Sequence, residues 1–142
     1  MEIEKNKAVR DRLLLEGWEL EGSWVNQEGE KHDTFRKGDT ILKVEIQVFG
    51  TLPKKPKFKF KDFDCAILYS GVDFFVLPGA YVRTIEFLHK SFLLFRNRFD
   101  LIGMKGKKLL GELMDLGLKG SDFLNTTEYF YDLQDNRRVL IT

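Results

Sequence analysis

Two continuous apolar runs in the middle of the chain constrain its fold most. Residues 63–69 and 72–77 are almost entirely hydrophobic, a Ser-Gly pair separates them, and a Pro-Gly pair ends the second. Such runs are typical of strands that are covered on both faces, because a strand with one solvated face alternates instead. The chain is therefore expected to place helices on both sides of a sheet.

The remaining periodicities complete an α/β (α+β) domain in which a mixed central β-sheet is flanked by helices. Residues 4–16 predict an amphipathic helix that Gly17 ends, and residues 18–25 predict a strand. A hairpin is expected from 32–36 and 40–49, joined by a glycine turn at Lys37-Gly38-Asp39. A strictly alternating strand is expected at 57–61, and a long helix from 84 to about 97–99. The expected core order is α-β-β-β-(β)-β-β-α over residues 1–100. Residues 101–142 are expected to form an extension, a short helix plus a hairpin that turns at 134–136. This extension is either part of the same domain or an appendage that contacts DNA or a dimer partner.

Length and composition fit a single globular domain. The chain has 142 residues, of which 43% are hydrophobic and 13 are Phe, enough to bury a core. Its one cysteine, Cys65, excludes an internal disulfide framework. No run approaches the roughly 18 apolar residues of a membrane span, so we expect a soluble, cytoplasmic protein of prokaryotic or viral type with no membrane partner.

The net charge of +1 conceals an uneven distribution. Residues 43–61 carry six lysines against Glu45, and residues 83–108 carry seven basic residues against two acids, so each block is +5. Two interpretations stay open: solvated charged faces, or a surface that binds a polyanion such as DNA. The basic residues expected to contact DNA are Lys54, Lys55, Lys57, Lys59, Lys61, Arg96 and Arg98.

Two acidic residues on neighbouring strands are the strongest chemical signal. Asp33 begins one strand of the expected hairpin, and Glu45 lies on the next. Carboxylates brought together in this way suit Mg²⁺, which prefers oxygen ligands, and a bound Mg²⁺ activates water for phosphodiester hydrolysis. Lys43 and Gln47 share the face of Glu45, where they could touch a phosphate or the attacking water. His32 could shuttle protons or contact the metal, although a structural role is the commoner outcome.

This pattern resembles the PD-(D/E)xK nuclease superfamily. Asp33, followed twelve positions later by Glu45-Ile46-Gln47, is similar to the family's Asp and Glu-x-Lys motif. The stretch from Leu42 to Pro78 resembles the small group of homing endonucleases associated with group I introns. Gln47 stands where the family has lysine, and His32 stands where it has proline.

The resemblance implies a restriction-endonuclease-like core and a Mg²⁺-dependent, or alternatively Mn²⁺-dependent, DNA endonuclease of homing or restriction type. Asp33, Glu45 and the carbonyl of Ile46 would hold the metal, Glu4 would support the site, and Gln47 would orient water or phosphate. Duplex DNA would be cut by a homodimer.

There are three alternative hypotheses to the endonuclease. They are a catalytically inactive nucleic-acid-binding module on the same fold, a Holliday-junction resolvase, and a small-ligand or protein-interaction domain. The endonuclease hypothesis requires the Asp33 and Glu45 carboxylates to converge on one metal. If the two side chains point to opposite faces of the sheet, this form of the nuclease hypothesis fails.

Overall fold

The computed structural model of the protein describes residues 6–79, 85–104, 106–118, 130–132 and 137–139. Its elements, in chain order, are α2 (Lys7–Leu15), β1 (Glu19–Val25), β2 (Lys31–Lys37), β3 (Thr40–Val48), β4 (Cys65–Tyr69), β5 (Phe74–Leu77), α3 (Ile85–Ser91), the 3₁₀ turns η2 (Phe92–Phe95) and η3 (Phe99–Leu101), α4 (Gly106–Asp115), β6 (Phe130–Asp132) and β7 (Arg137–Val139).

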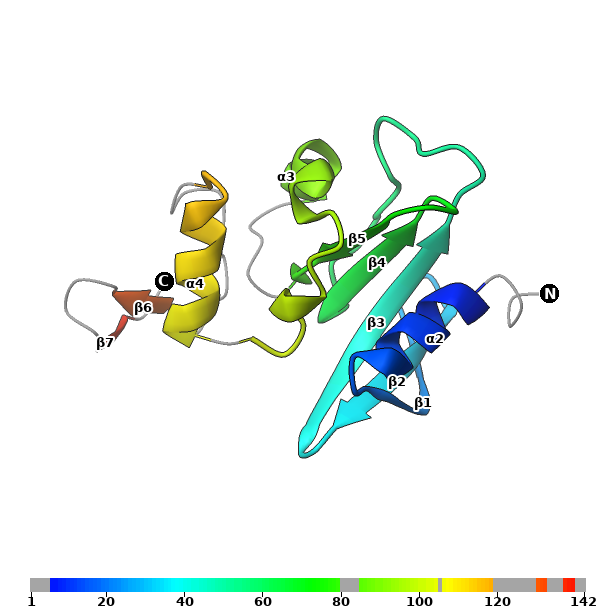
Figure 1. Ribbon diagram of the computed structural model, residues 1–142, viewed down its shortest axis with the longest axis horizontal. Helices are drawn as coiled ribbons and strands as arrows, with labels where there is room; N and C mark the ends of the chain where they lie inside the picture. The colour runs from blue at the N-terminus through cyan, green and yellow to red at the C-terminus, as the bar shows by residue number, and fades with distance from the viewer. Residues whose placement is uncertain (1–5, 80–84, 105, 119–129, 133–136, 140–142) are drawn as a thin grey trace.

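The first five strands form one open mixed sheet in the order β1-β2-β3-β4-β5 (Figure 1). Strands β1, β2 and β3 pair antiparallel, β3 and β4 pair parallel, and β4 and β5 pair antiparallel. Gly38 turns the β2–β3 hairpin with a φ of +61°, as the Lys-Gly-Asp turn predicts. The mixed sheet and its hairpin are therefore confirmed.

Helices cover both faces of the sheet, as the two apolar runs require. Helix α2 packs Val9 and Leu13 on one face, over Phe35 and Ile67. On the other face, α3, η2 and α4 share a core with β4 and β5 (Figure 1). Its helical members are Leu88, Phe92, Phe95, Leu109, Leu110 and Leu113. Helix α4, at the start of the expected extension, thus packs in the same core as the sheet.

The end of α2 shows why this helix stops where the sequence indicates. Gly17 adopts a φ of +95°, and the Trp18 N–H donates to the carbonyl of Leu13 at 2.9 Å. This backbone closure is the left-handed cap that glycine permits. Leaving the helix, Trp18 is 3% exposed and lies in the core beneath α2.

The expected strand at 57–61 is wrong, because these residues form a loop and belong to no strand. Phe58 is buried while Phe60 is 41% exposed, so the two rings do not share one face. The peptide N–H of Phe58 is bound by His89 of α3 instead of by a neighbouring strand.

The expected long helix is also wrong beyond residue 91, where α3 gives way to η2 and then to Asn97 with a φ of +56°. Asn97 exchanges hydrogen bonds with the backbone of Phe74, and Arg96 forms a β-bridge with Phe75. The chain leaves the helix to cover the open edge of β5, an interaction that helical periodicity cannot reveal.

The tail forms the antiparallel pair that the sequence predicts, β6 with β7, while its expected turn at 134–136 lies outside the described residues. Within the part of the chain that the structure describes, no helix is long and apolar enough to cross a membrane.

The packing of α2 gives a first prediction. Leu13→Ala is expected to lower the free energy of unfolding by about 2–5 kcal/mol, because Leu13 is 1% exposed between helix and sheet. Leu15→Ala, at a site 82% exposed on the same helix, should change it by less than about 0.5 kcal/mol. Denaturant titration measures both, and equal losses would contradict this packing.

Candidate functional site

The register of the hairpin separates the two acids of the predicted metal pair. Asp33 pairs with Val44, so their side chains share one face, and Glu45, the next residue along β3, faces the other. Val44 packs in the core under α2, whereas Glu45 lines a pocket on the opposite side. The structure therefore does not bring Asp33 and Glu45 together, because the pleat sends their carboxylates to opposite faces of the sheet.

Asp33 has a structural partner instead. Arg10 of α2 donates through Nε and Nη2 to the two carboxylate oxygens, each at 2.8 Å. The Asp33 side chain is 12% exposed and lies by a separate hollow of about 420 Å³. A bidentate, largely buried ion pair of this kind holds α2 against β2. Both carboxylate oxygens of Asp33 are engaged by Arg10.

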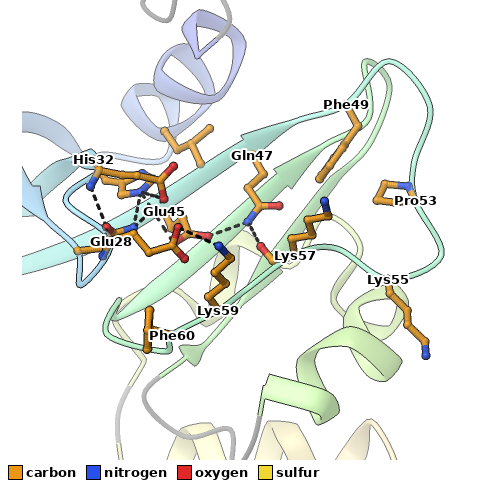
Figure 2. Close-up of a pocket in the computed structure, with 13 residues that line it drawn as sticks. Glu28, His32, Glu45, Gln47, Phe49, Pro53, Lys55, Lys57, Lys59 and Phe60 are labelled. Carbon is orange, nitrogen blue, oxygen red and sulfur yellow. Dashed lines mark hydrogen bonds and ion pairs between the residues drawn. The ribbon is translucent and has the colours of Figure 1, made fainter.

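Glu45 lies in a half-enclosed pocket of about 630 Å³ between β3, the β1–β2 turn and the loop that follows β3 (Figure 2). The pocket brings together the predicted residues Glu45 and Gln47 with three of the predicted lysines. The lining residues are Asn26, Glu28, Glu30, His32, Glu45, Ile46, Gln47, Phe49, Pro53, Lys55, Lys57, Lys59 and Phe60.

Burial dominates the chemistry of Glu45. The residue is 7% exposed, and this desolvation raises the pKa of its carboxyl from 4.5 to about 7. A hydrogen bond from Gln47 opposes the shift, while the negative charges of Glu30, Asp62 and Glu28 add to it. A carboxyl that gains and loses its proton near neutral pH is a common feature of functional sites.

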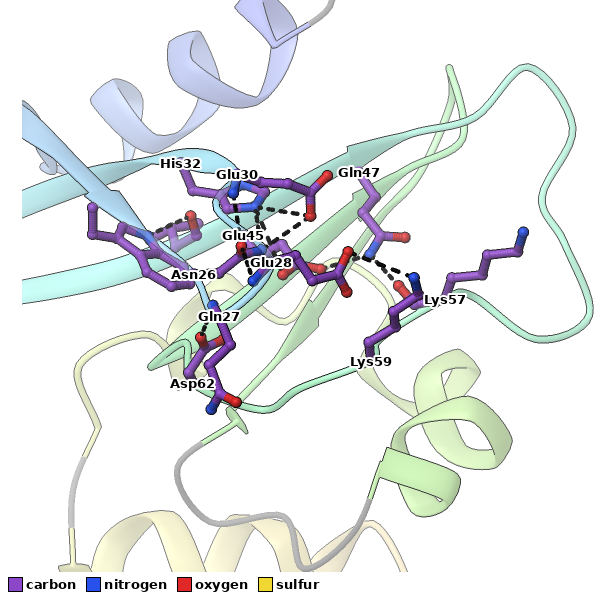
Figure 3. Close-up of polar contacts among 12 residues, drawn as sticks. Asn26, Gln27, Glu28, Glu30, His32, Glu45, Gln47, Lys57, Lys59 and Asp62 are labelled. Atoms are coloured by element: carbon purple, nitrogen blue, oxygen red, sulfur yellow. Dashed lines mark hydrogen bonds and ion pairs between the residues drawn. The ribbon is translucent and has the colours of Figure 1, made fainter.

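His32 shares the face of Glu45, and its Nε2 lies 3.9 Å from Glu45 Oε1 (Figure 3). The orientation of Asn26 assigns the ring nitrogen. Asn26 Oδ1 accepts from the N–H groups of Glu28 and Glu30, so its Nδ2 faces Glu30 Oε1 at 3.0 Å and His32 Nε2 at 3.1 Å. We infer that Nε2 accepts this bond, so its lone pair points to the Asn26 amide and the ring carries its proton on Nδ1.

Gln47 joins the floor of the pocket to its wall. Its Nε2 donates to Glu45 Oε2 and to the carbonyl oxygen of Lys57, both at 2.7 Å (Figure 2). Both amide hydrogens are thus engaged, and Gln47 holds the lysine-bearing loop against β3. This arrangement differs from the predicted role of orienting water or phosphate, since only the side-chain oxygen remains for that purpose.

The predicted DNA-contacting residues fall into two groups. Lys54, Lys55, Lys57 and Lys59 are exposed on the loop, and burial lowers the pKa of Lys61. Arg98 is bound by Asp100 and Glu112, and it is 24% exposed. Arg96 is 63% exposed but paired with Asp73 at 2.9 Å. The loop lysines are therefore better placed for an external polyanion than the two arginines, whose charges the protein itself offsets.

Three other predicted residues lie as follows. The Lys43 ammonium sits 5.4 Å from the centre of the Trp24 ring, outside the pocket lining. Ile46 lines the pocket while its side chain packs in the core under α2, so it presents main chain there. Glu4 lies outside the described residues.

Sequence reasoning missed Asn26, Glu28 and Glu30 and gave His32 a minor role. Glu28, Glu30 and His32 are spaced two residues apart, the spacing of one strand face, which could have linked them. Among the described residues, no three His, Cys, Asp or Glu side chains are grouped closely enough to hold a metal ion as they stand. Comparison with protein-family models, curated proteins and solved structures gives no match to this chain.

The raised pKa of Glu45 predicts how stability depends on pH. The folded protein binds this proton more tightly than the unfolded chain, so the free energy of unfolding should fall as pH rises from about 4.5 to about 7 and level off above. Glu45→Gln has no such proton to lose. Between pH 4 and pH 8, the difference in free energy of unfolding between this variant and wild type should therefore shift in favour of the variant by about 3 kcal/mol.

Denaturant titrations in EDTA across this pH range measure the effect. Glu19→Gln serves as the control, because that side chain is exposed on β1 and lies outside the pocket. A constant difference between wild type and Glu45→Gln at every pH would contradict the assignment.

The Arg10–Asp33 pair predicts a loss of stability when its charge is removed, whereas Glu45→Gln is expected to gain stability at high pH. Asp33→Asn is expected to lower the free energy of unfolding by about 1–3 kcal/mol, because it removes the charge from a largely buried bidentate pair. A double-mutant cycle with Arg10→Met should show that most of this loss is shared by the two residues. Additive single-site effects would count against the pairing.

Proposed function

We propose that this protein is a nuclease that hydrolyses phosphodiester bonds of DNA at the Glu45 pocket. One observation carries the proposal: a single cavity combines a buried carboxyl with a pKa of about 7, a histidine nitrogen 3.9 Å from it, and a wall that bears three lysines. Concave sites with perturbed acids and converging polar groups are the usual places for chemistry. The lysines supply the attraction for phosphate.

The residues of the pocket divide the work of such a reaction. Lys55 and Lys57 would neutralise the phosphates of the bound strand from the loop. Glu45 and His32, facing each other at the floor, would take up and release the protons of the attacking water and the leaving oxygen. Gln47 would keep the loop and Glu45 in one fixed arrangement.

A divalent cation remains part of the proposal with a changed set of ligands. Asp33 does not fit, since it faces α2. Glu45, Glu30 and His32 carry oxygen and nitrogen donors of the kind a divalent cation takes, with His32 Nε2 lying 3.9 Å and 4.0 Å from the two carboxylate oxygens. These side chains would have to move closer together to bind one. Bound there, Mg²⁺ or Mn²⁺ would polarise a phosphate and lower the pKa of a water ligand. A nitrogen donor among the ligands favours Mn²⁺, because Mg²⁺ demands nearly ideal oxygen coordination.

We also propose that the chain belongs to the PD-(D/E)xK superfamily. Within it, the protein would be a homing or restriction endonuclease, with a Holliday-junction resolvase as the alternative. Supporting the first are the element order, a helix followed by five strands and a helix, and Glu45-Ile46-Gln47 on the middle strand. A homodimer is proposed for cutting both strands of a duplex, because each chain brings one such pocket.

A cleavage assay tests the proposal. Supercoiled, linear, four-way-junction and single-stranded DNA are incubated with the protein in EDTA, Mg²⁺ or Mn²⁺. We expect no cutting in EDTA, cutting with either cation that is faster with Mn²⁺, and loss of at least about a hundredfold in Glu45→Gln. Asp33→Asn, folded under the assay conditions, should cut like wild type.

Two results would oppose the proposal. Cutting that survives in Glu45→Gln would indicate a contaminating nuclease or another site. Loss of cutting in Asp33→Asn at full folding would return the chemistry to the other face of the sheet.

The second candidate is a nucleic-acid-binding module without catalysis. It is favoured by Gln47, whose neutral amide stands where the resembling family has a lysine and is occupied by Glu45 and by the Lys57 carbonyl. DNA binding that weakens with salt, without cutting under any cation, would support this function and exclude the nuclease.

A further inference from the structure

We propose that the nucleic acid which enters the Glu45 pocket is single-stranded, with an unpaired base stacked on Phe60 and the adjoining phosphates held by the loop lysines. The inference rests on the proposed function for the identity of the ligand as nucleic acid. It adds the form of the strand that the site accepts.

The first argument is the shape of the site. Glu45 is 7% exposed at the floor of a half-enclosed pocket, beneath the loop that carries Lys55 and Lys57 (Figure 2). The phosphates of a duplex lie on the outside of a stiff, convex rod, and its bases are stacked within. A rod of that kind meets the rim of such a cavity, whereas a single strand, including one that is locally unpaired from a duplex, can bend into it. The volume of about 630 Å³ falls in the range of sites that enclose a small molecule.

The second argument is the exposure of one aromatic ring among lysines. Phe58 is 3% exposed in the core, but Phe60, two residues on, is 41% exposed and lines the pocket beside Lys59. An exposed ring next to ammonium groups is the combination by which proteins hold single strands, because every base has a face that can stack. A paired and stacked base would leave this ring in water.

The charges of the pocket set the direction of the strand. Glu28 and Glu30 on the β1–β2 turn repel phosphate, and Lys59 of the loop approaches this turn, 3.8 Å from Glu28 (Figure 3). The side chains of Lys55 and Lys57 lie on the opposite wall. The backbone of the strand therefore follows the lysine loop, and the base, which carries no charge, turns toward Phe60.

Fluorescence anisotropy in EDTA tests the inference without cleavage. A labelled oligothymidine of about 12 nucleotides is compared with a blunt duplex of equal length, over about 50–200 mM salt, with an oligouridine as the RNA arm. We expect either single strand to bind at least about tenfold more tightly than the duplex. Equal or tighter binding of the duplex would overturn the inference.

Variants locate the binding. Phe60→Ala should weaken single-strand binding about tenfold or more, and Phe60→Trp should restore it, because the larger ring still stacks. Leu94→Ala is the control, since Leu94 is 43% exposed and outside the pocket. Unchanged binding by Phe60→Ala, or displacement of the oligonucleotide by an equal concentration of thymidine monophosphate, would overturn the proposed strand.

The two proposals fail separately. Single-strand binding without cleavage under any cation removes the nuclease and keeps this inference. Cleavage of duplex DNA with no preference for single strands removes this inference and keeps the nuclease.

Discussion

Strand β3 is the element on which the other parts of the molecule depend. It lies in the middle of the sheet, antiparallel to β2 and parallel to β4, so both of its backbone edges are paired. Its pleat sends Val44 into the core under α2 and Glu45 into the pocket. A shift of one residue would bury a carboxyl under the helix and expose two apolar side chains, so the register is strongly fixed. The position of Glu45 thereby follows from the core.

Burying Glu45 beside other acids is unfavourable for its charged form, and the surroundings show how the protein tolerates it. Gln47 supplies one hydrogen bond, and the raised pKa leaves the group largely neutral in mild acid. The core would be as well filled by an apolar residue, so stability alone does not explain a carboxyl here. Glu45 lowers stability and lies next to His32 and the lysine wall. A functional role therefore explains this carboxyl better than a structural one.

Local patterns predicted the elements well and the site only in part. Alternation placed β2, β3 and their glycine turn, and the two apolar runs predicted a sheet covered on both faces. Alternation alone could not fix the pairing of β2 with β3, and a single residue of register decides whether Asp33 or His32 faces Glu45. The loop at 57–61 and the early end of α3 were missed for a similar reason. Contacts with His89 and with the edge of β5 override the local period.

The distribution of positive charge gives Gln47 a definite place in the proposed site. In the motif that the chain resembles, a lysine on the strand brings the cation directly to the reacting phosphate. Here the cations are on the flexible side chains of a loop, and Gln47 ties that loop to β3 through the Lys57 carbonyl. A neutral amide can bond a carboxyl and a peptide oxygen together without adding charge to a buried floor. In the proposed site, β3 would supply the rigid acid and the loop would supply the phosphate contacts, which is the division of roles that a single nucleic-acid strand bending into the pocket would require.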